Sequence, residues 1–304
     1  MGTDGLGAFI GCESLATKNG VVSHFIGMRL RWLELALTHH DGHSAIYTHS
    51  MMTQHGGRLD WLDALRGAAV VWMAVFHLCF DLSQFGWFQH NFYDEPLWVW
   101  QRTVIVSLFL FCAGFGQAIA AAQGQTWRRF WRRWVQVLGG ALLVTLGSWL
   151  MFPNSFIYFG MLHGMALMLI IARLTTRWGG WLWFLGAVAI AAKFAASYAL
   201  QTGDAPDLAN ALNAPAWNWI GWITHKPTTE DYVPLFPWMG VMWWGVASGH
   251  WLLRHATHSL TKPLPVHLGS LAWLGRHSLF FYLLHQPVLI GTMVAIVWLS
   301  KVIP

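Results

Sequence analysis

Charged residues are scarce in this sequence. Only 10% of its 304 residues are Asp, Glu, Lys or Arg, whereas soluble domains usually carry about 25%. Hydrophobic residues make up 56% of the chain. This balance excludes a soluble domain with a single anchor and indicates a polytopic membrane protein. The 22 tryptophans agree with that class, because indole rings favour the headgroup level of a bilayer.

Cysteines are also few. Cys12, Cys79 and Cys112 have no paired spacing, which argues against a disulfide framework or a cysteine-based metal site. The formal net charge is +5, but the basic residues fall between apolar runs, where they control topology. We therefore expect a lipid bilayer as partner, no nucleic acid and no metal.

Residues 1–57 differ from the rest of the chain. They contain six histidines, no long apolar run and no signal-peptide pattern. This composition predicts a poorly ordered, His-rich extension before a membrane domain at 58–304. Metal binding by the histidines is an alternative for this stretch, as is a translation start at Met51 or Met52.

Apolar runs follow Arg58, and most are long enough to cross a bilayer core about 30 Å thick as helices of about 20 residues. They cover residues 64–82, 98–122, 131–152, 156–173, 180–200, 234–253 and 273–299. The sequence thus predicts an all-α, polytopic transmembrane helix bundle with about seven spans. The fourth run is the shortest, so we expect it to be tilted or partly sheltered.

Charge alternates between the loops. Arg58 precedes the first run, the next loop is acidic, and the one after it is rich in arginine, at 128–133. Loop 201–233 is acidic again, and the last loop is basic. Because basic loops stay in the cytoplasm, we expect the N-terminus inside and the C-terminus outside, in the cytoplasmic (inner) membrane. The tryptophans of loop 201–233 favour an interfacial segment, either a plain aromatic anchor or a lid over an external substrate.

Histidines at positions 77, 163 and 285 lie inside three of these runs. Hydrocarbon offers no partner for imidazole nitrogens, so these residues predict a polar site inside the bundle. Arg66 lies eleven residues before His77, about 16 Å away and about 20° past three helical turns, so both share one face. Asp81 lies one turn beyond His77 and can orient its ring. The structural alternative is a snorkelling Arg66, paired with Asp63, and a histidine hydrogen-bonded within the bundle.

Two further positions are candidates at the ends of the bundle. His90 follows Trp87 and Phe88 in the first outer loop, where it is either an ordinary solvated histidine or part of a site. Arg276 lies at the inner end of the last run, where an anionic cofactor could bind.

Several of these motifs resemble a known family. Leu-Asp-Ala-Leu-Arg-Gly, with ten residues between Arg66 and His77, is similar to the superfamily of integral membrane acyltransferases that modify sugars. The segments YFGMLHGMAL, VPLFPWMGVMWWG and LGRHSLFFYLLHQPVL resemble more narrowly the bacterial relatives of heparan-alpha-glucosaminide N-acetyltransferase. The likeness covers about residues 58–299. The chain departs from the lysosomal enzyme in having fewer spans and no large luminal N-terminal region.

The resemblance implies acetyl-CoA as donor on the cytoplasmic side and a sugar amine or hydroxyl as acceptor on the other side. The lysosomal enzyme's catalytic histidine in the first non-cytosolic loop implies His90, whereas the wider superfamily implies His77. We expect His77 to act as general base, or as an acetyl carrier, with Asp81 fixing its tautomer. His90 is then expected to share the proton transfer or to hold the acceptor. We expect the donor to be bound by Arg66, Arg276, His163 and His285.

Acetyl transfer needs a base near neutral pH, which histidine supplies, and donors for the developing oxyanion. No Gly-rich phosphate loop is visible, so the bundle itself must bind the donor. The sequence therefore predicts a membrane acyltransferase. One alternative is a redox protein in which His77, His163 and His285 hold a haem. Another is a transporter or non-catalytic membrane protein. The acceptor and the oligomeric state stay open.

Overall fold

The computed structural model describes residues 59–87, 89–203, 206–256 and 263–302. The chain divides into two units, Met1–Gly56 and Gly57–Pro304. All described residues belong to the second unit, so the expectations for residues 1–57 lie outside them.

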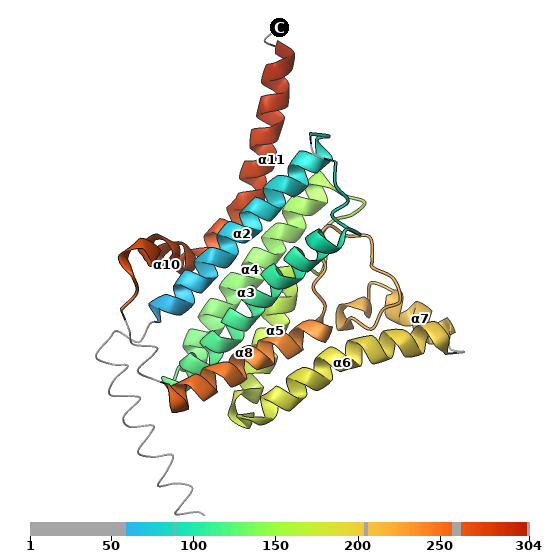
Figure 1. The fold of residues 1–304 in the computed structure, drawn as a ribbon. Coiled ribbons are helices and arrows are strands. Elements are labelled where there is room, and N and C mark those ends of the chain that lie inside the picture. Colours follow the sequence, from blue (N-terminus) through green and yellow to red (C-terminus); the bar gives the residue numbers. More distant parts are fainter. Residues whose placement is uncertain (1–58, 88, 204–205, 257–262, 303–304) are drawn as a thin grey trace, which may run out of the picture. The chain divides into compact units, whose positions relative to one another are not determined.

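The described residues form helices and no strand, which confirms the all-α prediction (Figure 1). The longer helices are α2 (Asp60–Gln84), α3 (Pro96–Ala122), α4 (Trp127–Met151), α5 (Met161–Thr175), α6 (Trp181–Thr202), α8 (Leu235–His255) and α11 (Ser278–Val302). The short ones are η1 (Thr176–Trp178), α7 (Pro206–Asn213), η2 (Asn218–Ile220), η3 (Val266–Leu268) and α10 (Gly269–Arg276).

Each of the first six predicted runs corresponds to one of the longer helices. Of the longer helices, α2, α3, α4, α6 and α11 are long and apolar enough to cross a membrane by length and composition. Helix α5 has 15 residues, about 22 Å at 1.5 Å per residue, so it is shorter than a bilayer core. The chain is thus a multi-pass membrane protein, and the count of seven crossings stays a prediction.

The last predicted run, 273–299, is not one helix. The structure divides it at His277 into α10 and α11. His277 has φ −106° and ψ 18°, and its ring Nδ1 donates to the Trp273 carbonyl at 2.9 Å. Both halves are apolar, so hydropathy gives no sign of this break.

Glycines bring helices α3 and α8 close together. A Cβ on Gly114 would overlap the Met242 carbonyl, and one on Gly245 would overlap the Phe111 carbonyl. Small residues at such crossings let two backbones approach closely. Helix α6 packs on the other side of α8, and the most buried side chains of this core come from α3, α5, α6 and α8: Leu110, Met168, Leu182, Met239, Met242 and Val246.

A second glycine crossing joins α2 and α10. A Cβ on Gly67 would overlap the Leu271 carbonyl, and one on Gly275 would overlap the Asp63 carbonyl. Figure 1 shows α10 beside the start of α2 and α11 along its later turns. The crossing therefore brings the Arg66 motif and the Arg276 motif together, although 210 residues separate them.

Candidate active site

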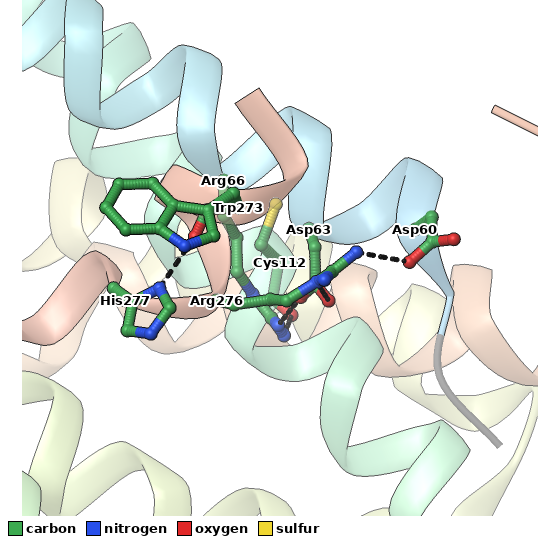
Figure 2. Close-up of polar contacts among 7 residues, drawn as sticks. All are labelled: Asp60, Asp63, Arg66, Cys112, Trp273, Arg276 and His277. Carbon is green, nitrogen blue, oxygen red and sulfur yellow. Dashed lines mark hydrogen bonds and ion pairs between the residues drawn. The ribbon is translucent and has the colours of Figure 1, made fainter. Parts of the chain in front are cut away.

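Two aspartates and two arginines form a charge cluster at the α2–α10 crossing (Figure 2). Arg66 Nη1 lies 3.0 Å from Asp63 Oδ1, and Arg66 Nη2 donates to the Cys112 carbonyl on α3 at 3.1 Å. Arg276 Nη2 lies 3.0 Å from Asp60 Oδ1, and its Nε lies 3.8 Å from Asp63 Oδ2.

This cluster bears on the expected donor site. Arg66 and Arg276 were the arginines predicted to meet the CoA phosphates, and Asp63 was the alternative partner of Arg66. The structure forms the Asp63 pair. Because Asp60 and Asp63 offset both guanidinium charges, a phosphate would have to displace or share a carboxylate here. The cluster also ties α2 to α3 and α10.

His77 and His285 meet inside the bundle. Their ring centroids are 4.9 Å apart, with the ring planes inclined at 56°. His285 Nδ1 lies 2.6 Å from the Tyr282 carbonyl. A carbonyl oxygen only accepts, so Nδ1 carries the proton in this bond and Nε2 of the neutral ring carries the lone pair. His77 has no hydrogen bond within the described residues, and its Nδ1 is buried.

Asp81 is engaged by α11 instead of by His77. Its Oδ1 accepts a hydrogen bond of 2.9 Å from Gln286 Nε2, and the residue is only 4% exposed. The i, i+4 spacing did place Asp81 on the His77 face of α2. The Gln286 amide reaches the carboxylate from the neighbouring helix, so the predicted tautomer-fixing bond to His77 is not present.

The two histidines, Asp81 and Gln286 each have a polar atom without a hydrogen-bond partner among the described residues. His77 Nδ1, Asp81 Oδ2, His285 Nε2 and Gln286 Oε1 are all buried in this state. An unsatisfied buried polar atom costs about 1–3 kcal/mol, so several in one place call for a ligand or water. We name these four residues the buried polar cluster. Along α2 it lies between the charge cluster at the start of the helix and the loop that carries His90.

His163 has separate partners. Its Nδ1 accepts from the Gly160 N–H at 3.3 Å, and its Nε2 lies 3.0 Å from Thr145 Oγ1. Thr145 Oγ1 also donates to the Ile157 carbonyl at 2.8 Å. Both ring nitrogens are therefore used in holding the start of α5 to α4. The structure brings His77 and His285 together and places His163 apart from them, between α4 and α5.

His90 pairs with Glu95 in the loop between α2 and α3. His90 Nδ1 lies 2.8 Å from Glu95 Oε2, with 43% and 38% of the two side chains exposed. The backbone N–H of Asn91 donates to Glu95 Oε1 at 2.7 Å. That bond, followed by the one from His90, lowers the pKa of Glu95. The loop borders an open hollow of about 480 Å³, lined by Ser83, Gln84, Gly86, Gln89, His90, Asn91, Phe92, Tyr93 and Glu95.

The segment before α8 packs against this loop and against α5. Lys226 Nζ lies 4.9 Å from the centre of the Tyr93 ring, a cation–π contact between the two connections. Asp231 Oδ2 accepts from the Met161 N–H at 2.6 Å, at the N-terminus of α5. The tryptophan-containing loop is thereby attached to the loop that carries His90, which fits the lid interpretation as well as the anchor.

Two polar residues, Lys193 and Gln286, were not among the candidates from sequence, and only Lys193 could have been found there. Lys193 lies within the run 180–200, and a lysine inside a span marks a specific partner. Its Nζ donates to Ser197 Oγ at 2.8 Å and to the Ile223 carbonyl at 3.3 Å, which connects loop 201–233 to α6. Gln286 follows His285 directly, but only the packing of α11 on α2 shows that it meets Asp81.

Comparison with known proteins identifies the family. The family model for heparan-alpha-glucosaminide N-acetyltransferase, catalytic, matches residues 58–287. The chain belongs to this family. No curated protein and no solved structure matches it. The heparan-alpha-glucosaminide N-acetyltransferase match runs from the start of α2 to Pro287 in α11, so it contains the charge cluster, the His90 loop and the buried polar cluster.

Membership confirms the resemblance seen in the sequence and identifies a membrane protein of the acyltransferase class. The helices described here agree with it, because their polar groups collect within and at the ends of a bundle. No group of three His, Cys, Asp or Glu side chains in the described ranges is placed to hold a metal ion. The polar groups available for chemistry are imidazoles, carboxylates, an amide and arginines.

Proposed function

We propose that this protein transfers an acetyl group from cytoplasmic acetyl-CoA to an amine or hydroxyl of a sugar or glycan on the outer side of the inner membrane. The observation that carries the proposal is the buried polar cluster. It supplies unpartnered imidazole nitrogens inside a helix bundle of an acyltransferase family, between an arginine-rich end and an outer histidine loop.

The chemistry requires one bond to form and one to break. The acceptor nitrogen or oxygen attacks the acetyl carbonyl carbon, and the carbon–sulfur bond breaks with its electrons moving to sulfur. The acceptor loses a proton, and the CoA thiolate gains one. An imidazole of the His77–His285 pair is suited to receive that proton near neutral pH. The protein supplies this base either for direct transfer or through an acetyl-enzyme.

His90 suits the acceptor side of this reaction. Its ring is held by Glu95 beside an open hollow at the outer end of α2. From there it can hold the acceptor or share in proton transfer. The family resemblance of the His90 position supports a direct role, and its exposure supports contact with a soluble sugar.

The donor's phosphates need cationic partners. Arg66 and Arg276 are near the expected inner face, although each has an aspartate partner. The N-terminal turns of α4 carry further exposed arginines that form no ion pair with another described residue: Arg128, Arg129, Arg132 and Arg133. We propose that CoA is bound by the bundle at this face, with the exposed arginines available to its phosphates.

Thermal shift and acetyl transfer test the proposal. Purified protein should be stabilised by acetyl-CoA and by CoA, because a ligand of the native state raises its stability. With radiolabelled acetyl-CoA and glucosamine, label should appear on the sugar and free CoA thiol should be released. Stabilisation by neither compound, together with no label on glucosamine or on methyl glucoside, would exclude the acyltransferase activity. A Soret band in the purified protein would instead support haem binding.

A further inference from the structure

The hydrogen bonds of the buried polar cluster distinguish its two histidines. His285 Nδ1 is held by the Tyr282 carbonyl at 2.6 Å, so its tautomer is fixed with the lone pair on Nε2. His77 contacts the rings of His285 and Phe76, but it makes no hydrogen bond within the described residues, so no hydrogen bond there fixes its tautomer. A general base works best when another group orients it and leaves its basic nitrogen free.

We infer that His285 is the catalytic general base of the reaction proposed above, with Nε2 as the atom that takes the proton from the acceptor. The Tyr282 carbonyl orients the ring and stabilises the imidazolium that forms, because Nδ1–H remains its donor. The proton then moves from Nε2 to the sulfur of the departing CoA thiolate. Every atom is accounted for: the acceptor gains the acetyl group and CoA gains the acceptor's proton.

The surroundings of His285 fit this assignment. Nε2 is buried and has no partner among the described residues, as a base awaiting substrate requires. The other titratable rings that face His285 are His77 on α2 and Tyr282 on α11. Gln286, the residue after His285, donates a hydrogen bond of 2.9 Å to the Asp81 carboxylate. His77 is then a neighbouring ring that lines the site.

The substitution His285→Asn tests the basic Nε2 separately from the hydrogen bond between Nδ1 and the Tyr282 carbonyl. The Asn amide nitrogen occupies the place of Nδ1 and can still donate to the Tyr282 carbonyl, but the basic Nε2 is gone. We expect His285→Asn to bind acetyl-CoA with wild-type affinity by thermal shift. Its kcat for acetyl transfer to glucosamine should fall by about 10²–10⁴-fold, the usual contribution of a general base. His77→Asn should cost less. His250→Gln is the matched control, since His250 lies on α8 with Nε2 2.9 Å from the Thr176 carbonyl, and it should turn over normally.

Several outcomes would overturn the assignment. Wild-type kcat in His285→Asn, with loss only in His285→Ala, would show that the ring merely supports the helix. A larger loss in His77→Asn would assign the base to His77. If the His285 variants do not fold, the wild-type enzyme decides: its kcat should rise with pH through the range of an imidazole, about pH 5–8, and a flat profile would exclude His285 as base. No acetyl transfer by the wild type would instead refute the proposed function itself.

Discussion

Asp231, in the segment before α8, accepts a 2.6 Å hydrogen bond from the backbone N–H of Met161, 70 residues earlier in the chain. A carboxylate from another segment of the chain thus caps the N-terminus of α5. Free N–H groups and the helix dipole favour an anion at that end of a helix. Gly160, the N-cap of α5, leaves space for it, because a Cβ there would lie 2.5 Å from Asp231 Oδ2. The start of α5 therefore depends on a distant loop.

Replacing Asp231 tests this cap. Asp231→Ala should lower the free energy of unfolding by about 1–2 kcal/mol, the usual cost of losing a cap. Asp231→Asn keeps an acceptor oxygen and should cost much less at neutral pH. Thermal unfolding in detergent measures both variants. Equal losses in the two variants would mean that the charge, and not the hydrogen bond, stabilises α5.

The pH dependence of Asp231 follows from its surroundings. Burial raises the pKa of this carboxyl above its ordinary 3.8, and the Met161 N–H and Lys226 only partly oppose the effect. The folded state therefore holds the proton more tightly than the unfolded state. The resulting stability is complete below pH 3.8 and is lost as pH rises through the folded pKa. Asp231→Asn should remove this decline in a series of unfolding measurements, and an unchanged pH dependence would contradict it.

Alanine substitutions test the close crossing of α2 and α10. Gly67→Ala and Gly275→Ala would each drive a methyl group into a backbone carbonyl of the other helix. We expect each to cost about 1–3 kcal/mol of stability, as overpacking does. Gly139→Ala in α4 is the control, because its Cβ would meet nothing within 4 Å. That variant should gain roughly 0.5–1 kcal/mol from reduced backbone entropy. Similar effects in all three variants would refute the close crossing.

The sequence predicted local features well and long-range partners poorly. Hydropathy placed a helix on each predicted run, and the helical repeat placed Arg66, His77 and Asp81 on one face of α2. The Asp63–Arg66 pair was also predicted, since it lies within one turn. Nothing local indicated that Gln286 would take Asp81, because that contact depends on how α11 packs against α2. Likewise, the break at His277 depends on α10 crossing α2 at Gly275, which hydropathy does not register.

The Arg66–Asp63 pair can be measured by a double-mutant cycle. Asp63 keeps 5% of its side chain exposed and Arg66 keeps 27%. Arg66→Ala should cost roughly 1–3 kcal/mol, less than a fully buried pair, because Arg66 is partly hydrated and Arg276 still faces Asp63. Asp63→Ala and the double variant complete the cycle, with unfolding as the measurement. Additive losses would show that the two side chains do not interact. An accompanying drop in CoA affinity would add a phosphate role for Arg66.

Topology is tested by labelling single cysteines. In a background without Cys12, Cys79 and Cys112, the exposed positions Gln123 and Thr202 can each carry one cysteine. Alternating loop charge predicts that Gln123→Cys reacts only from the cytoplasmic side and Thr202→Cys only from the outside. An impermeant maleimide applied to intact cells and to inverted vesicles distinguishes them. Labelling of Thr202→Cys from the inside alone would reverse the proposed orientation of donor and acceptor.

Substitutions in the His90–Glu95 pair test whether the loop between α2 and α3 binds the acceptor or takes part in the chemical step. Glu95 Oε2 lies 2.8 Å from His90 Nδ1. Glu95→Gln should therefore leave the ring in place with a weaker hydrogen bond at Nδ1. If His90 holds the acceptor, His90→Ala should raise KM for glucosamine and change kcat little, whereas His285→Asn should lower kcat.

The hydrogen bonds of Glu95 predict how KM for glucosamine depends on pH. The Asn91 N–H and His90 lower the pKa of Glu95 below its ordinary 4.5. The contribution of the carboxylate is therefore present above pH 4.5 and is lost as pH falls through the folded pKa. KM for glucosamine should rise over that acid range in the wild type and stay level in Glu95→Gln. If His90→Ala abolishes kcat while His285→Asn retains it, the base is the loop histidine, and the buried pair serves only to line the site.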